Sequence, residues 1–320
     1  MPRILVVAPN WIGDALMAQP LLMRLRGKHP GVEIDVLAPE WVAPVVRRMA
    51  EVEEVIAVPF QHRALQLAER WKIARALKAR GYGEAIVLPN SWKSALVPFF
   101  AGIPVRTGYL GESRYGLLNS IHQKANGSMA LHYSALSGPR GTQAKEPLPE
   151  PRLRVERQEI EAARRRFGIH GAYGAFCPGA EYGPAKRWPY FPELSRRLKA
   201  QTLILGAPND REAAQGILGR NLAGETTLDE AIALIAGADY VVTNDSGLMH
   251  IAAALGRPQV ALFGSSSPKH TPPLSSAARV IWLGVECSPC FERECPLGHF
   301  RCMREMTVEA VLEEIQNLAA

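Results

Sequence analysis

Short apolar runs alternate with longer amphipathic stretches along the whole chain, which is the pattern of parallel strands joined by crossover helices. In the first half, this pattern predicts strands at residues 4–8, 32–37 and 85–88, and helices at 15–26 and 65–78. The turn after the first strand is predicted at 9–14. The segment 89–119 is rich in glycine, proline and aromatic residues and is predicted to form loops and short helices.

A change of composition separates this half from the next. Between Ser137 and Pro151 the chain becomes rich in Gly, Pro, Lys and Glu, which predicts a linker. The alternation then restarts, with helices predicted at 156–166, 191–198, 228–236, 248–255 and 308–318, and strands at 172–177, 202–205, 240–243 and 260–263. We therefore expect two doubly wound α/β domains, at residues 1–150 and 151–320, and the last helix can pack on either of them.

Composition and charge narrow the function classes. A chain of 320 residues with 47% hydrophobic content suits two domains of about 150 residues each. The N-terminal apolar run, Ile4 to Ala8, is too short for a signal peptide or a membrane span, so we expect a cytoplasmic protein. The net charge of +6 is spread along the chain, which favours phosphorylated substrates or an anionic membrane surface over nucleic acid.

Two loops that follow predicted strands carry candidate ligand groups, because ligands of open parallel sheets bind at the carboxyl ends of strands. In Thr243–His250, the residues Ser246 and Gly247 open a helix, and their backbone N–H groups can bind a diphosphate. A plain helix cap explains the same residues. In Pro178–Pro189, glycines allow close approach of the backbone, and Lys186 either neutralises phosphate charge or lies in solvent.

Strings along nearly the whole chain resemble one family, in the same order. They are Trp11–Asp14, Leu88–Ala95, Phe99–Pro104, Arg106–Gly108, Pro178–Pro189, Asn221–Thr226, Asn244–His250 and Ala252–Leu255. Together they resemble glycosyltransferase family 9, and strings of this length are far more specific than a lone glycine motif. Leu88–Ala95 and its neighbours narrow the resemblance to the members that add the second heptose of the lipopolysaccharide inner core.

The resemblance implies a GT-B enzyme, with two Rossmann-like domains facing across a cleft. The acceptor would bind to the N-terminal domain and the donor to the C-terminal one. The implied reaction moves L-glycero-D-manno-heptose from ADP-heptose to the first heptose of a lipid A-linked core oligosaccharide, with inversion and without a divalent metal. The basic charge and the lipid-linked acceptor suggest peripheral contact with the inner membrane from its cytosolic face.

The implied chemistry assigns residues in the first half. An inverting transfer needs a base that takes the proton of the acceptor hydroxyl. Asp14 matches the family's catalytic aspartate, and Gly13 before it leaves room for a substrate, whereas helix capping is the alternative role of Asp14. Lys93, Arg106 and Arg114 are assigned with them to the acceptor site, since cations suit an acceptor that carries phosphates and acidic sugars.

The second half is assigned to the donor. The leaving ADP gains negative charge, which Lys186, the second predicted catalytic residue, and the backbone N–H groups of the helix start are expected to stabilise. By resemblance the donor site consists of Gly179, Lys186, Asp210, Asp245, Ser246, Gly247, Leu248 and His250. Asp210 would bind the ribose, although Glu212 is close enough to take that role. His250 can equally be a structural histidine on a helix face.

Four cysteines gather near the C-terminus, at Cys287, Cys290, Cys295 and Cys302. The initial C-x-x-C spacing resembles a structural zinc site, but the later spacings match no standard zinc finger. A structural zinc and four reduced thiols therefore both stay open.

Two other functions also stay open. The first is the heptosyltransferase that acts on Kdo-lipid A, which shares elements like Asp14, Lys186 and Asp245–Gly247. The second is a protein of another class, a non-catalytic two-domain binder of a sugar nucleotide.

Overall fold

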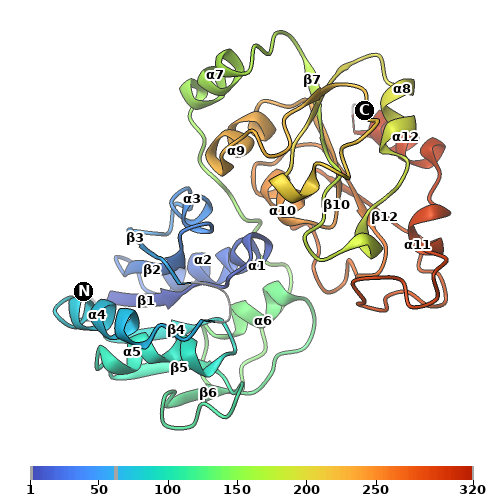
Figure 1. Cartoon of the computed structure of the whole chain (residues 1–320). Coiled ribbons are helices and arrows are strands. Elements are labelled where there is room, and N and C mark those ends of the chain that lie inside the picture. The colour runs from blue at the N-terminus through green and yellow to red at the C-terminus, as the bar shows by residue number, and fades with distance from the viewer. Residues whose placement is uncertain (1–2, 61–63, 319–320) are drawn as a thin grey trace. The chain divides into compact units, whose positions relative to one another are not determined.

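The computed structural model describes residues 3–60 and 64–318, and the chain divides into two compact units, Met1–Pro149 and Glu150–Ala320. Each unit is a parallel sheet with helices on both faces (Figure 1). The boundary lies within a stretch without helix or strand, between α6 (Met129–Ala135) and α7 (Arg157–Arg166). This architecture confirms the predicted fold class of two α/β domains with Rossmann-like sheets.

Within its described residues, the first unit has a six-stranded sheet in the order β3-β2-β1-β4-β5-β6. The strands are β1 Arg3–Val7, β2 Glu33–Pro39, β3 Glu54–Val58, β4 Glu84–Val87, β5 Val105–Tyr109 and β6 Ser120–His122. The helices are α1 Ile12–Met17, α2 Gln19–Lys28, α3 Ala43–Val46, α4 Leu67–Lys78, the 3-10 helix η1 Trp92–Ala95, α5 Leu96–Phe100 and α6 Met129–Ala135. The central strand β1 pairs in parallel with β2, Ile4 opposite Ile34, and with β4, Ile4 opposite Glu84.

The described part of the second unit repeats this plan, with the strand order β12-β11-β10-β7-β8-β9. The strands are β7 Tyr173–Cys177, β8 Gln201–Ile204, β9 Arg220–Asn221, β10 Tyr240–Asn244, β11 Gln259–Phe263 and β12 Ala278–Trp282. The helices are α7 Arg157–Arg166, η2 Pro184–Lys186, α8 Phe191–Arg197, η3 Pro208–Asp210, α9 Leu228–Ala236, α10 Gly247–Ala254, α11 Arg301–Arg304 and α12 Val308–Asn317. In both sheets the chain starts at a central strand, runs to one edge, and returns to the centre before it runs to the other edge.

The central strands are apolar runs because helices cover both of their faces. All five residues of β7, Tyr173 to Cys177, are buried. On one face of the second sheet, Phe176 and Leu262 share a core with Phe191 of α8 and Val311 of α12. The last helix thus packs within its own unit.

Several predicted elements differ from the structure. The helix predicted at 15–26 is two helices, α1 and α2, that meet at Ala18. Pro20 lies in the first turn of α2, where a missing N–H group is tolerated, whereas the interior of one continuous helix would lose a hydrogen bond there. Because α1 already begins at Ile12, Gly13 and Asp14 lie in its first turn and not in the preceding loop.

Apolar periodicity did not predict five of the strands, which are β3, β5, β6, β9 and β12. The segment predicted as loops and short helices contains one of them, β5. These strands are short or lie toward the sheet edges, and their residues are partly exposed, as the pattern of β12 shows. Their sequences therefore lack the apolar run that identifies a buried strand.

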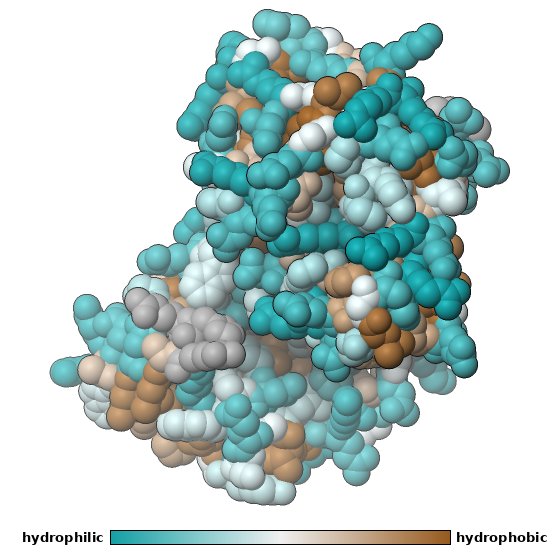
Figure 2. Space-filling model, turned by 45° about the vertical axis from the view of Figure 1, so that its right-hand side comes forward, coloured by the Kyte–Doolittle hydropathy of each residue, from teal (hydrophilic) through white to brown (hydrophobic). Residues whose placement is uncertain are grey.

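The surface carries no extended apolar belt on the face that Figure 2 presents, where hydrophilic residues dominate and hydrophobic ones form separate small patches. Among residues 3–60 and 64–318, none of the helices combines the length and apolar character that crossing a bilayer requires.

Trp188 provides a test of how the second unit holds together. Its indole is 3% exposed, and its Nε1 donates a 2.9 Å hydrogen bond to the carbonyl of Met306. We expect Trp188→Phe to lower the free energy of unfolding by roughly 1–3 kcal/mol, since the carbonyl loses its donor and the core loses volume. Urea unfolding followed by circular dichroism measures this. Trp71→Phe, at an exposed indole, is the control and should leave the midpoint unchanged.

Candidate active site

Both sheets reverse their strand order at one place, between β1 and β4 in the first unit and between β7 and β10 in the second. Ligands of open α/β sheets bind beyond the carboxyl ends of the strands at this switch point, because the loops there diverge to opposite faces. The loop after β7 carries Gly179 and Lys186, and the loop after β10 carries Asp245 to Gly247. These predicted donor residues therefore lie at the switch point of the second unit, whereas Asp210 follows the neighbouring strand β8.

A buried amide joins the two sides of this switch point. Asn244, the last residue of β10, donates from Nδ2 to the carbonyl of Pro178 at 2.7 Å, and its Oδ1 accepts from the backbone N–H of Trp188 at 3.1 Å. Asn244 is fully buried. Both ends of the loop Pro178–Trp188 are thus fixed to β10 by a single side chain.

Lys186 and Asp245 form an ion pair at the centre of the site. The Lys186 Nζ lies 2.5 Å from Asp245 Oδ2, and the same oxygen accepts a 2.5 Å hydrogen bond from Ser266 Oγ. The Lys186 ammonium also lies 4.8 Å from the centre of the Tyr182 ring, a cation–π contact. Lys186 is therefore held at the sheet edge and does not lie free in solvent.

The start of α10 has the geometry of an anion site. Ser246 precedes the helix in an extended conformation, and within the described chain its side chain makes no capping hydrogen bond. Its Oγ lies instead 3.4 Å from Thr243 Oγ1. The first N–H groups of α10, including that of Gly247, are thereby left for a ligand, and the helix dipole favours a negative one.

His250 lies in α10 with only 6% of its surface exposed. Burial lowers its pKa to about 4, with a smaller raising effect from Asp245 and a smaller lowering effect from Lys186. At neutral pH the imidazole is therefore uncharged, and it adds no charge next to the Lys186–Asp245 ion pair. Leu248 stands between Gly247 and the buried Met249 in the same helix.

Asp210 lies against Gly179. A methyl group built on Gly179 would overlap the Asp210 carboxylate, so only glycine allows this approach. Asp210 Oδ2 accepts a 2.9 Å hydrogen bond from the backbone N–H of Ala207. Glu212, the alternative residue for the ribose, has an exposed side chain 3.9 Å from Arg187. Of the two carboxylates, Asp210 is the one that borders the glycine loop after β7.

In the first unit, Asp14 lies in the first turn of α1, directly after β1. The buried Tyr133 of α6 is hydrogen-bonded to Asp14, and burial together with this carboxylate raises the Tyr133 pKa, so its hydroxyl stays protonated. A protonated hydroxyl beside a carboxylate donates to it and fixes its orientation. The helix start also stabilises the negative charge of Asp14.

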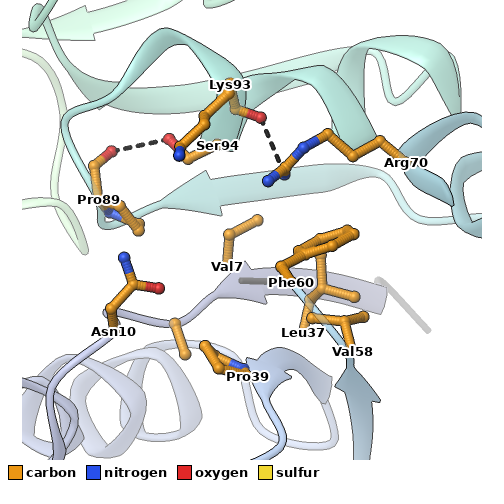
Figure 3. A pocket seen from close by; sticks show the side chains of 11 residues that line it. Val7, Asn10, Leu37, Pro39, Val58, Phe60, Arg70, Pro89, Lys93 and Ser94 are labelled. Carbon is orange, nitrogen blue, oxygen red and sulfur yellow. Dashed lines mark hydrogen bonds between the residues drawn. The ribbon is translucent and has the colours of Figure 1, made fainter. Parts of the chain in front are cut away.

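A pocket of about 130 Å³ opens at the carboxyl ends of β1 to β4 (Figure 3). Its lining residues are Val7, Ala8, Asn10, Leu37, Pro39, Val58, Phe60, Arg70, Pro89, Lys93 and Ser94. Lys93, predicted from sequence, is among them, and its Nζ donates to the carbonyl of Ala64 at 3.2 Å. Arg70, which the sequence did not single out, is its neighbour in the pocket.

Arg106 and Arg114 are bonded to the main chain. Arg114 is 1% exposed and donates to the carbonyl of Pro89 at 2.7 Å, to Ser94 Oγ at 3.1 Å and to the carbonyl of Tyr109. Burial lowers its pKa to about 10, so it keeps its charge at neutral pH. Arg106 donates to the carbonyls of Leu117 and Ile103, both at 2.6 Å. These contacts hold the loops after β4 and β5 in place.

The four clustered cysteines, Cys287, Cys290, Cys295 and Cys302, are free thiols around one small cavity, which His299 also lines. Burial, and then the neighbouring thiols, raises the pKa of Cys302. Over residues 3–60 and 64–318, no three or more His, Cys, Asp or Glu side chains are arranged to hold a metal ion. The arrangement therefore gives no support to a structural zinc here.

The cysteine segment instead contacts the loop that carries Lys186. The carbonyl of Arg293 accepts from the backbone N–H of Ala185 at 3.0 Å, and Arg293 Nε donates to the carbonyl of Tyr182 at 2.7 Å. The Tyr182 hydroxyl donates to the carbonyl of Phe291. The segment thus supports η2, whose last residue is Lys186.

Comparison with known proteins agrees with this architecture. The sequence profile of glycosyltransferase family 9 (heptosyltransferase) matches residues 70–301. The chain belongs to this family of glycosyltransferases.

Its relatives include lipopolysaccharide heptosyltransferase 2 of Escherichia coli K12, 44% identical over 99% of this chain and 98% of the relative. Lipopolysaccharide heptosyltransferase 1 of the same strain is 27% identical over 83% of this chain and 89% of the relative. The solved structure of E. coli ADP-heptose lipopolysaccharide heptosyltransferase II superposes with a TM-score of 0.87 at 42% identity, covering 99% and 98% of the two chains. These similarities confirm the family resemblance and the GT-B type of fold predicted from the sequence.

The buried His250 makes the stability of the fold depend on pH. Its pKa is about 4 in the folded chain and 6.5 when unfolded, so the unfolded chain binds the proton more readily between these values. Stability is therefore complete above pH 6.5 and falls as the pH drops toward 4, by about 3 kcal/mol in total.

We expect His250→Gln to remove this part of the pH dependence, measured as the free energy of urea unfolding at several pH values. His270→Gln, at an exposed histidine, should keep the parent's dependence. Equal slopes for the parent and the His250 variant would contradict the assignment.

Proposed function

We propose that this chain is a lipopolysaccharide heptosyltransferase 2. In this proposal it moves L-glycero-D-manno-heptose from ADP-heptose to the first heptose of a lipid A-linked core oligosaccharide and inverts the anomeric centre. The observation that carries the proposal is the cluster of Lys186, Asp245 and the start of α10 at the switch point of the second unit. It occurs in a chain that is 44% identical to lipopolysaccharide heptosyltransferase 2 over nearly its whole length.

The first unit supplies the acceptor site and the base. The Asp14 carboxylate takes the proton from the acceptor hydroxyl while that oxygen attacks the anomeric carbon. The hydrogen bond with Tyr133 fixes the orientation of the carboxylate. Gly13 beside it carries no side chain, so the acceptor can approach. Lys93 contributes positive charge to the same edge, while Arg114 positions the loop that carries Lys93.

The second unit supplies the donor site. As the glycosidic bond breaks, its electron pair passes to ADP, and the diphosphate gains charge. Lys186 and the N–H groups of Ser246 and Gly247 stabilise this charge, because preorganised donors act most strongly on charge that develops in the transition state. Asp245 and Ser266 hold the Lys186 ammonium in position. Asp210, beside Gly179, accepts hydrogen bonds from the ribose hydroxyls.

We place the enzyme in the cytoplasm, at the cytosolic face of the inner membrane. The net charge of +6 favours peripheral contact with anionic lipids, where the lipid-linked acceptor resides. ADP-heptose and the core oligosaccharide are the proposed partners, and nucleic acid is not among them.

The acceptor is tested by transfer from ADP-heptose to purified acceptors that end either in Kdo or in the first heptose. We expect transfer only to the heptose-terminated acceptor. Transfer only to the Kdo-terminated acceptor would overturn the specific proposal in favour of heptosyltransferase 1 activity. It would leave the family assignment intact.

The base is tested by Asp14→Asn. We expect kcat to fall by roughly 10²–10⁴-fold, because the amide cannot take the proton. Affinity for ADP, measured by calorimetry, should stay at the parent value. Transfer at the parent rate would show that another group is the base.

Tyr133→Phe tests the positioning of this carboxylate. One lost hydrogen bond should lower kcat by about five- to tenfold with little change in KM. Tyr115→Phe, at an exposed tyrosine of the same unit, is the control and should have parent kinetics.

A further inference from the structure

The pocket of the first unit contains a buried cation, Arg70, that pairs with no carboxylate among residues 3–60 and 64–318. Arg70 is 4% exposed, and its Nε and Nη1 donate to the carbonyls of Leu65, at 2.7 Å, and Lys93, at 3.1 Å. Among the described residues, no Asp or Glu side chain lies within ion-pair distance of its guanidinium. The carbonyl oxygens orient the guanidinium but carry no full negative charge. The cost of removing the positive charge from water is therefore not offset as it would be in an ion pair.

The surroundings of Arg70 are shaped for a ligand. Its guanidinium lies 3.9 Å from the centre of the Phe60 ring, which holds it by a cation–π contact. Figure 3 shows the guanidinium reaching over the pocket from α4, with Phe60 below it and Asn10 and Pro89 on the far side. Lys93, the second cation of the lining, comes from the loop after β4. Two positive charges thus border one partly apolar pocket.

The volume limits what can bind. A space of about 130 Å³ is well above the roughly 10–15 Å³ that one water molecule needs. That is room for one phosphate or carboxylate group together with part of the ring that carries it. The apolar lining, which includes Val7 and Leu37, would contact the ring, and the cations would contact the anionic group.

Three exposed indoles are close in sequence to residues that line this pocket. Trp11, Trp41 and Trp92 are all exposed, and each is one or two residues from a residue that lines the pocket. Trp41 Nε1 donates to the carbonyl of Asn10 at 2.8 Å, which fixes one of these rings at the rim. Rigid rings of this kind offer large contact surfaces to a ligand that extends out of the pocket.

We propose that this pocket is an anion subsite for the acceptor, in which Arg70 and Lys93 bind a phosphate or carboxylate substituent on a sugar next to the one that is glycosylated. This subsite rests on the proposed function, because it presumes an anionic oligosaccharide acceptor. It assigns a binding role to Arg70 and makes Phe60 the residue that positions its guanidinium.

The test is steady-state kinetics of the full-length chain with three forms of the heptose-terminated acceptor: unmodified, dephosphorylated and carboxyl-reduced. We expect Arg70→Met and Lys93→Gln each to raise the acceptor KM by roughly tenfold or more, the worth of a charge-assisted hydrogen bond. The KM for ADP-heptose should not change. Arg70→Lys should recover part of the loss, and Arg75→Gln, at an exposed arginine of the same helix, should have the parent KM.

The modified acceptors separate binding from structural support. If the subsite binds phosphate, the parent has a higher KM for the dephosphorylated acceptor than for the unmodified one. The two variants, which have already lost the contact, have the same KM for both. If it binds carboxylate, the carboxyl-reduced acceptor gives this result instead. The proposed subsite would be overturned if the ratio of variant KM to parent KM were the same for all three acceptors. It would also be overturned if both variants had the parent KM.

Two further outcomes stay distinguishable. If Arg70→Met fails to fold, as judged by its thermal midpoint, the Lys93→Gln series decides the question alone. If the parent does not use the heptose-terminated acceptor at all, the proposed function itself fails. Parent activity with unaffected variants contradicts only the subsite.

Discussion

The reversal of strand order at the centre of each sheet is the constraint on which both sites depend. Where neighbouring strands send their loops to opposite faces, the strand ends are left uncovered, and the loops need another support. Asn244 provides it in the second unit by bonding Pro178 and Trp188 on the neighbouring loop. Arg114 does the same in the first unit through Pro89 and Ser94. In both units a buried polar side chain uses its hydrogen bonds to fix a loop, and that loop carries Lys186 in the second unit and Lys93 in the first.

The charges of the second site nearly cancel before a ligand arrives. Lys186 is paired with Asp245, and His250 beside them is neutral at physiological pH. A buried pair contributes little net stability because both ions lose water, so its worth here lies in orientation. The positive potential that remains comes from the N–H groups at the start of α10. In the proposed donor site these N–H groups favour an anion, and they would act most strongly when charge develops on the diphosphate in the transition state.

Much of this could be predicted from the sequence, and the limits have physical causes. Apolar periodicity predicted the central strands, and the family resemblance singled out Asp14, Lys186 and Asp245 in the segments that follow them. Neither singled out partners such as Tyr133 and Ser266, which belong to distant segments and meet these residues only through the fold. The sequence also does not show which arginines are bonded to the main chain. Arg114 and Arg70 both donate to carbonyl oxygens in the structure, yet the sequence singled out only Arg114.

The cysteine segment follows the same logic of loop support. Gly183 has a φ of 147°, and a side chain there would overlap the carbonyl of Arg293. This close approach lets Arg293 accept the hydrogen bond from Ala185, the residue before Lys186. The position of the Lys186 ammonium therefore depends on two loops at once, one tied to β10 by Asn244 and one carried by the segment around Cys290. A change in the cysteine segment that displaced Arg293 would reach Lys186 through the adjacent residue Ala185, without any direct contact with Lys186 itself.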